Sequence, residues 1–308
     1  TTAAFFTAPS FPHVALGAMT ADILSAHLPG DRVRPLLEAA EDADGIAAFS
    51  ESFVQGLDDE RVRHTHFLVE DGGDVVACAG LAEDGSAELV VHPDFRRKGI
   101  GEALARKVRA ESPDTGLWAH GNLAGAKALA AKLGLSVSRE LLVMGISADD
   151  IPSGGPELPG GFEALDYVGA VERWGRDAVE KQWLEVNNDA FSWHPEQGGW
   201  DLERLHRAME ADWFDPAGVQ LLYEGEQLAG FHWTKRHPDG TGEVYVVGIA
   251  SRHRGEGMGG PLMQMGLNHL VVEGSPQVIL YVEADNVPAV KRYLQLGFKV
   301  DESHVVYK

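Results

Sequence analysis

The chain has 308 residues, of which 44% are hydrophobic and 24% are charged, a composition typical of a soluble globular protein with room for two domains. Its formal net charge of −21 argues against nucleic acid or an anionic membrane as a partner, because both would be repelled at long range. The single cysteine, Cys78, excludes an intrachain disulfide and is expected to be a small buried residue in a strand. These features favour a cytoplasmic protein.

The first domain is predicted to span residues 21–150, after an extension over residues 1–20 that lacks the basic region of a secretory signal. Helical segments come first in this domain. Three β-type runs follow at 66–70, 74–82 and 87–92, separated by the turn signals DGG and EDGS, and they are predicted to form an antiparallel meander.

A glycine-rich turn, RRKGIG, follows the meander at residues 96–101. After this turn the pattern predicts a helix at 101–110, a strand at 117–120, a helix at 124–133 and a closing strand at 136–146. Gly134 follows the second helix, where a C-terminal cap belongs.

A segment rich in proline and glycine, residues 151–161, is predicted to be a linker to a second domain at 162–308. The second domain repeats the order of the first, with strands at 220–224, 227–235 and 242–249, a helix at 258–272, a strand at 278–283, a helix at 287–296 and a strand at 298–307. Pro261 lies in the first turn of its helix, where a missing N–H costs little. The sequence therefore predicts an α/β duplication.

The glycine turn is the feature that recurs most clearly between the two halves. The pattern RxxGxG places Arg96, Gly99 and Gly101 in the first copy, and Arg254, Gly257 and Gly259 in the second. Both copies join a β-type run to a helix-type run. Glycine lets the backbone approach a ligand closely, and the N–H groups at a helix start attract anions. Two sites for a phosphorylated cofactor are therefore predicted.

Together with the motif NxxAxxxYxxxGF at 286–298, this order of elements resembles the GNAT superfamily of acetyl-CoA-dependent N-acyltransferases, in two copies that cover almost the whole chain. The longer strings AELVVHPDFRRKGIG, LWAHG, NNDAFSWHPEQGGW, GFHWTKRHPD, GEVYVVGI and ILYVEADN are similar to tandem members that acetylate the cysteinyl amine of desacetylmycothiol, which is cysteinyl glucosaminyl inositol. The resemblance implies two tandem GNAT domains of α/β (α+β) type, each with a mixed, mostly antiparallel sheet flanked by helices. It also implies a monomer that uses acetyl-CoA as co-substrate and no metal.

In that superfamily the glycine turn wraps the coenzyme A pyrophosphate, and the strand before it splays from its neighbour to pair with the pantetheine arm. Gly248 suits such a splay or bulge. By resemblance, the cofactor-binding residues of the first copy are Leu89, Val90, Val91, Arg96, Arg97, Lys98, Gly99, Ile100, Gly101 and Glu102. Those of the second copy are Val247, Gly248, Ile249, Arg254, Gly255, Glu256, Gly257, Met258, Gly259, Gly260, Asn286, Val287, Pro288, Ala289, Val290 and Lys291.

The two copies differ at the residues that chemistry needs. Tyr293 of the second copy aligns with Ala130 of the first, and only a phenol can donate a hydrogen bond to a departing thiolate. Glu243 resembles the base of the family, which takes a proton from the amine directly or through water. The backbone of residues 247–249 is expected to polarise the thioester carbonyl. The second copy is therefore predicted to be catalytic, and the first to be an inactive copy that still binds acetyl-CoA.

The acceptor carries an amine, hydroxyl groups and a thiol, so its pocket needs polar side chains. By resemblance, the substrate-binding residues are Glu51, Glu196, Lys235, Glu243 and Tyr281. The histidines at 194, 232 and 237 match no compact metal-ligand spacing, so polar or packing roles are expected for them.

Two other functions remain open at the level of the sequence. One is a tandem GNAT enzyme that acetylates a different small amine, such as an aminoglycoside, an amino acid or a peptide. The other is an acetyl-CoA sensor in which both copies bind and neither reacts. The pair Glu243 and Tyr293 argues against the sensor.

Overall fold

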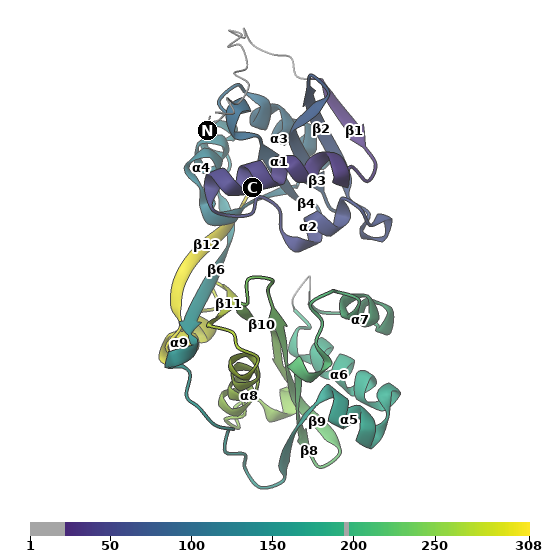
Figure 1. The fold of residues 1–308 in the computed structure, drawn as a ribbon, viewed down its shortest axis with the longest axis vertical. Helices are drawn as coiled ribbons and strands as arrows, with labels where there is room; N and C mark the ends of the chain where they lie inside the picture. Colours follow the sequence, from purple (N-terminus) through teal and green to yellow (C-terminus); the bar gives the residue numbers. More distant parts are fainter. Residues whose placement is uncertain (1–21, 194–196) are drawn as a thin grey trace, which may run out of the picture. The chain divides into compact units, whose positions relative to one another are not determined.

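The computed structural model describes residues 22–193 and 197–308 of the chain (Figure 1). The chain divides into two compact units. The N-terminal unit contains the residues up to Arg139 together with His304–Lys308, and the C-terminal unit contains Glu140–Ser303. The extension predicted at residues 1–20 and the predicted substrate-binding residue Glu196 lie outside the described residues.

The N-terminal unit is built on a mixed sheet with strand order β1-β2-β3-β4-β5-β12. Its strands are β1 (Ile23–Ala26), β2 (Thr65–Asp71), β3 (Asp74–Leu81), β4 (Ser86–Val91), β5 (Gly116–Ala119) and the end of β12 (Lys299–Tyr307). Its helices are α1 (Gly30–Asp44), α2 (Glu51–Gly56), α3 (Ile100–Glu111) and α4 (Ala124–Leu133). The antiparallel pairing of β2, β3 and β4 confirms the predicted meander, and β5 lies parallel to β4.

Helices cover both faces of this sheet. On one face, α3 packs Ile100, Leu104 and Val108, which are spaced by one helical turn, against Phe67 and Leu117 of the sheet. On the other face, α1 and α2 cover a second cluster, which contains Cys78 of β3. Cys78 is fully buried, as predicted for a small residue inside a strand, and burial raises the pKa of its thiol to about 12.

The C-terminal unit has the same layered architecture, with strand order β6-β11-β10-β9-β8-β7. Its strands are the greater part of β6 (Val137–Ser147), β7 (Phe162–Asp166), β8 (Val219–Glu224), β9 (Gln227–Arg236), β10 (Gly242–Ile249) and β11 (Gln277–Glu283), with the first part of β12. Its helices are α5 (Tyr167–Trp174), α6 (Arg176–Ala190), α7 (Leu202–Met209), α8 (Gly259–Val272) and α9 (Val287–Gln295). The meander β8-β9-β10 is again antiparallel, and β11 lies parallel to β10.

The two faces of this second sheet have different coverings. On one face, α5, α6 and α7 enclose a cluster rich in aromatic side chains, among them Trp183, Trp233 and Phe231. On the other face, α8 packs Leu262, Met263 and further apolar side chains against the sheet, and α9 covers its margin. The tryptophan at 233 is therefore a core residue.

The last strand of each repeat lies in the sheet of the other unit. Residues Val305–Tyr307 of β12 pair with β5 in the N-terminal unit, and residues 141–147 of β6 pair with β11 in the C-terminal unit. The two compact units divide at Arg139, and the domain bounds predicted from the repeat, with a linker at 151–161, stay a prediction. A strand pattern gives no information about which sheet the strand joins, because any free edge with matching side chains can accept it.

The strands and helices predicted from the pattern occur with bounds that differ by at most one residue at each end. The short edge strands β1 and β7 were not predicted from the sequence. No helix among the described residues is long and apolar enough to cross a membrane.

Candidate active site

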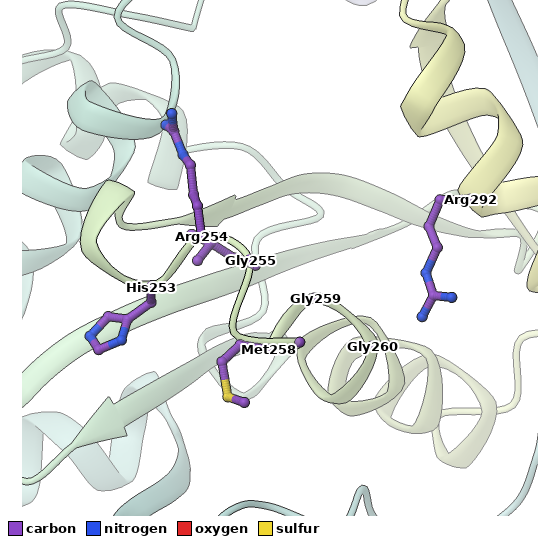
Figure 2. Close-up of a pocket in the computed structure, with 9 residues that line it drawn as sticks. His253, Arg254, Gly255, Met258, Gly259, Gly260 and Arg292 are labelled. Carbon is purple, nitrogen blue, oxygen red and sulfur yellow. The ribbon is translucent and has the colours of Figure 1, made fainter.

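The second glycine turn opens a hollow at the start of α8. The chain leaves β10 at Ile249, passes through a short 3-10 turn at Ser251–His253, and enters α8 at Gly259. The hollow has a volume of about 520 Å³ and is lined by Ile249, His253, Arg254, Gly255, Gly257, Met258, Gly259, Gly260 and Arg292 (Figure 2). Because the first N–H groups of an α-helix have no acceptor within the helix, this end of α8 favours an anion.

The shape of the turn depends on two of its glycines. Gly255 and Gly257 both adopt a φ of +83°, in the left-handed region that costs another residue roughly 1–2 kcal/mol. No atom of the described residues lies within 4 Å of the Cβ position of either glycine. The glycines are therefore required by the backbone conformation and not by crowding.

The cation that faces the turn comes from α9. Figure 2 shows the side chain of Arg292 extending from α9 toward the start of α8, and its Nη2 atom is 3.2 Å from the Cβ position of Gly260. Arg254 was predicted as a cofactor-binding residue. Its guanidinium extends the other way, and Nη2 donates to the carbonyl oxygens of Asp189 at 3.2 Å and Ala190 at 3.4 Å. Arg292 was not among the predicted cofactor-binding residues, which end at Lys291, because it falls at an unspecified position of the family motif at 286–298; its basic side chain beside Tyr293 was the available signal.

The first glycine turn has the same backbone pattern as the second. Arg97 and Gly99, which align with Gly255 and Gly257, have φ of +64° and +86°. Arg97 is thus a non-glycine residue held in the left-handed region, and such strain persists only where the surroundings enforce it. The backbone conformation of the glycine turn is therefore the same in both repeats.

The side chains around the first turn differ from those of the second. The guanidinium of Arg96 forms a bidentate ion pair with Asp44 at 2.7 and 2.8 Å, and its Nε donates to the carbonyl oxygen of Val91. Leu129 occupies the position equivalent to Arg292, with its Cδ2 atom 3.9 Å from the Cβ position of Gly101. The first turn therefore has a leucine where the second has a cation.

Glu102 adds a negative charge to the first turn of α3, at the position equivalent to Gly260. Its carboxylate pairs with Lys132 and Arg106. The hydrogen bond from Lys132, followed by the one from Arg106, lowers the pKa of Glu102, so this carboxylate stays charged in the neutral range. A carboxylate at this place repels an anion, unless Lys132 and Arg106 themselves bind that anion.

The strand β10 separates from β11 next to the predicted base. The two strands pair from Gly242 to Val244, opposite Val278 to Leu280, and a β-bulge lies between Val244 and Val246. The splay expected in this strand therefore begins at the bulge. Gly248, expected to suit a splay or bulge, lies in the splayed part of β10 and not at the bulge. A Cβ atom there would lie 2.7 Å from the ring of Phe231, so this glycine allows close packing.

Glu243 is buried at the base of this splay, with 5% of its surface exposed. Lys235 of β9 lies directly opposite in the ladder, and its ammonium is 4.9 Å from the ring centroid of Trp213 and 5.8 Å from that of Tyr245. The Nε2 atom of His237 is 2.7 Å from Oε2 of Glu243. The structure thus brings together two predicted substrate-binding residues, Lys235 and Glu243, and adds His237 beside them.

Tyr293 lies on α9, in the cluster with Val244 and Val247 that α8 covers. Its ring makes an edge contact with Phe298, with centroids 6.0 Å apart. Burial raises the pKa of the Tyr293 phenol, which makes it a poorer proton donor than a free tyrosine. Ala130, at the equivalent position of the first repeat, is buried and has no polar group.

The remaining predicted residues have separate places. Tyr281 is 44% exposed on β11, and Glu51 is an exposed residue at the start of α2 in the N-terminal unit. Asn286 caps α9, because its side-chain oxygen accepts the N–H of Ala289 at 3.4 Å. His232 is fully buried, and its Nδ1 bonds to the carbonyl oxygen of Leu262.

A polar cluster that the sequence analysis missed lies at the base of the splay in the N-terminal unit. The strands β4 and β5 pair only at Ser86 and Ala87, and the next residue, Glu88, is 2% exposed. Its carboxylate accepts the N–H of Ser50 at 2.7 Å and is 2.9 Å from Nε2 of His120, whose Nδ1 is 3.1 Å from Nδ1 of His304. The positions equivalent to Glu88 and His120 in the second repeat are Val246 and Glu283, so the two splays differ chemically.

Both repeats match models of the acetyltransferase (GNAT) family, the first over residues 63–134 and the second over residues 181–298. The chain is 50% identical to the mycothiol acetyltransferase of Corynebacterium aurimucosum, over 90% of this chain and 93% of that protein. The chain belongs to the mycothiol acetyltransferase family. Two further members are the mycothiol acetyltransferases of Corynebacterium efficiens, 44% identical over 95% of this chain and 99% of that protein, and of Mycolicibacterium vanbaalenii, 43% identical over 90% and 92%.

Solved structures agree with this family at the level of the fold. A GCN5-related N-acetyltransferase from Sphaerobacter thermophilus superimposes with a TM-score of 0.68 at 23% identity, over 92% of this chain and 94% of that chain. A tandem GNAT protein from the clavulanic acid biosynthesis pathway gives a TM-score of 0.66 at 20% identity, over 93% and 97%. The predicted fold of two tandem GNAT domains is thereby confirmed. As a member of the mycothiol acetyltransferase family, the chain is an acyltransferase.

Proposed function

We propose that the chain transfers the acetyl group of acetyl-CoA to the cysteinyl amine of desacetylmycothiol, giving mycothiol and free CoA, and that the second repeat carries out the reaction. The observation that supports this most directly is the 50% identity, over 90% of the chain, to a protein named mycothiol acetyltransferase. The site of the second repeat has the residues that such a transfer needs. The small-molecule acceptor and the co-substrate both follow from this assignment.

The hollow at the start of α8 suits the pyrophosphate of acetyl-CoA. It combines a turn with two left-handed glycines, the N–H groups of a helix start and the guanidinium of Arg292. The backbone of residues 247–249 continues from this hollow toward the bulge, so a pantetheine arm in the splay would reach the neighbourhood of Glu243. Acetyl-CoA supplies the activated acetyl group as a thioester.

Glu243 acts as the base of the reaction. The acceptor amine is protonated in part at neutral pH, since an α-amino group has a pKa of about 8. Glu243 takes this proton, directly or through water, and the free amine nitrogen attacks the thioester carbonyl carbon. A C–N bond forms as the C–S bond breaks, and the electron pair of that bond leaves on the CoA sulfur. The acetylated nitrogen releases its second proton to solvent and becomes an amide, and the CoA thiolate takes up a proton from solvent to give free CoA.

Tyr293 assists the departing sulfur. A tyrosine with a raised pKa is a weaker acid than a thiol, so complete proton transfer to the thiolate is uphill and a hydrogen bond from the phenol is the favoured role. Tyr293 and Glu243 lie on opposite sides of β10. Tyr293 is on the side covered by α8 and α9, and Glu243 is on the side covered by α6. A thioester in the splay between β10 and β11 is accessible from both faces.

The first repeat is proposed to hold a second acetyl-CoA that does not react. The support is the shared left-handed pattern of Arg97 and Gly99, whereas Ala130 in place of a tyrosine removes the donor for the sulfur. Calorimetric titration of the purified chain with CoA tests this proposal. Two CoA molecules per chain are expected; a stoichiometry of one, abolished by changing Gly257 to Val, would leave the first turn without a ligand.

Acceptor profiling tests the function itself. The protein is incubated with acetyl-CoA and one acceptor at a time, and CoA release is measured. Cysteinyl glucosaminyl inositol is expected to react far faster than an aminoglycoside, cysteine or a peptide with an N-terminal cysteine. Equal rates with the generic amines would contradict the acceptor assignment, and no CoA release with any acceptor would favour an acetyl-CoA sensor.

A further inference from the structure

The hairpin between β9 and β10 holds a histidine against the candidate base. The hairpin has the sequence HPDGTGE at residues 237–243. The N–H of His237 donates to the carbonyl oxygen of Thr241 at 2.8 Å, and the N–H of Gly240 donates to the carbonyl oxygen of His237 at 2.9 Å. Gly240 adopts a φ of +88°, which the turn requires. These contacts fix the backbone of His237 six residues before Glu243.

The turn is complete without the imidazole of His237. Asp239 accepts the N–H of Thr241 at 2.9 Å and its hydroxyl at 3.1 Å, and the N–H of Thr241 is the main cause of the lowered pKa of Asp239. The polar groups of the turn are therefore paired through the backbone and Asp239. The imidazole of His237 is therefore not needed to close the hairpin.

The imidazole instead faces the carboxylate of Glu243. The distance from Nε2 of His237 to Oε2 of Glu243 is 2.7 Å, and the side chain of His237 is 27% exposed whereas that of Glu243 is 7% exposed. An ionised carboxylate only accepts hydrogen bonds, so this contact assigns a proton to Nε2 of His237. The Oε2 atom of the largely buried Glu243 is thus held by His237, which lies on its solvent side.

We propose that His237 is a positioning residue for Glu243. It holds Oε2, which directs the other oxygen, Oε1, toward the acceptor amine in the splay of β10. The ammonium proton passes to the carboxylate of Glu243 and from there to solvent, while the Nε2–H of His237 remains a hydrogen-bond donor throughout. This inference rests on the proposed function, since it assigns a role through Glu243. Lys235 lies opposite Glu243 in the ladder, with its ammonium 5.8 Å from the ring centroid of Tyr245.

A pair of amide substitutions tests the role of Nε2. The amide nitrogen of glutamine can occupy the place of Nε2, whereas that of asparagine reaches only the place of Nδ1. For His237→Gln we expect a kcat within about threefold of the wild type, and for His237→Asn a kcat lower by roughly 10- to 100-fold, with the KM for acetyl-CoA unchanged, because misplacing a catalytic group by about 1 Å can cost 100-fold. Equal kcat values for the two variants would overturn the proposal.

A double-mutant cycle separates this inference from the proposed function. If His237 acts through Glu243 alone, then His237→Asn combined with Glu243→Gln is no slower than Glu243→Gln by itself. Additive losses would show that His237 acts independently of Glu243 and would overturn the positioning role. A fully active Glu243→Gln variant would instead contradict the assignment of the base. The control Thr241→Ala weakens the turn, and it should lower the melting temperature without the kcat loss of His237→Asn.

Discussion

The Nη2 atom of Arg292 lies 3.2 Å from the place that a Cβ atom on Gly260 would occupy, so a cation from α9 stands directly over the first turn of α8. The equivalent pair in the first repeat is Leu129 and Glu102, an apolar side chain and a carboxylate. This difference concentrates positive charge at the second turn, in a chain whose net charge is −21. An anionic co-substrate is therefore attracted locally, against the field of the whole protein.

Changing Arg292 to leucine, the residue of the first repeat, is expected to weaken the binding of acetyl-CoA. Hydrogen bonds that involve a charged group contribute about 1.5–3 kcal/mol, so the KM for acetyl-CoA should rise by roughly 10- to 100-fold while kcat changes little. The effect should shrink as the salt concentration rises. Steady-state kinetics at several ionic strengths provide the measurement. Arg173→Leu, which removes an exposed cation of α5, is the matched control and should leave the KM unchanged.

Changing Tyr293 to phenylalanine removes the proposed hydrogen bond to the CoA sulfur and keeps the ring that contacts Phe298. We expect kcat to fall by roughly 10- to 100-fold, which corresponds to about 1.5–3 kcal/mol for a bond to a developing charge, with acetyl-CoA binding retained. Tyr223→Phe is the control, because the Tyr223 hydroxyl is buried in the aromatic cluster and has no hydrogen-bond partner among residues 22–193 and 197–308. Wild-type turnover in Tyr293→Phe would remove Tyr293 from the mechanism.

The sequence predicted the repeated elements and the glycine turns well, because these depend on local patterns. Gly255 and Gly257 are needed for their own φ values, and the runs at β8, β9 and β10 reflect the burial of most of their residues within the unit. The sequence was a poorer guide to features that depend on contacts between distant segments. The direction of the Arg254 side chain, the place of the bulge near Val244 and the contact of His237 with Glu243 are all set by tertiary packing.

The exchange of the final strands could not be predicted from the sequence for the same reason. The pattern at 298–307 identifies a strand correctly, but Val305 lies beside Ala119 of the N-terminal unit. Nothing in the alternation of a strand encodes its neighbour. The polar cluster of Glu88, His120 and His304 illustrates the point further, since its members come from three separate segments and form a contact only after the strands have assembled.

Two helical glycines should respond in opposite ways to an added methyl group. The Cβ position of Gly266 in α8 is 2.2 Å from the ring of the fully buried His232, so Gly266→Ala forces the ring or the helix to move and should destabilise the protein by about 1–3 kcal/mol. Gly125 in α4 has no neighbour within 4 Å of that position, and Gly125→Ala should be stabilising by up to about 1 kcal/mol. Urea unfolding of both variants measures the difference, and equal effects would contradict the packing at His232.

Acid should destabilise the protein through its buried histidines. Burial lowers the pKa of His66 and of His232 to about 4, from 6.5 in an unfolded chain. Below pH 6.5 the unfolded chain therefore binds more protons than the folded one, so the stability falls as the pH decreases from 6.5 to 4, by up to about 3 kcal/mol for each histidine. Urea midpoints measured across this range should fall, and they should fall less steeply for His232→Leu. An unchanged slope in that variant would contradict the burial of His232 as the cause.

The end of the chain should stabilise the N-terminal unit rather than the repeat to which it belongs in sequence. Val305, Val306 and Tyr307 are all less than a tenth exposed, they pair with residues 117–119 of β5, and the Tyr307 hydroxyl donates to Asn122 at 2.7 Å. Burying one such side chain contributes about 1.5–3 kcal/mol, so removing residues 304–308 should cost an amount comparable to the stability of a whole domain.

Hydrogen exchange measured by mass spectrometry distinguishes where that loss falls. In the variant truncated after Ser303, peptides from β2 to β5 are expected to lose protection, while peptides from β8 to β10 retain it. Val300→Ala, at a half-exposed position of the same strand in the C-terminal unit, is the control and should leave both sets protected. Faster exchange in β10 and β11 with β2 to β5 unaffected would instead assign the last strand to the second repeat, as the contiguous boundary at residues 162–308 implies. The exchange pattern therefore decides between the two divisions of the chain, since each one places the same residues in a different hydrophobic core.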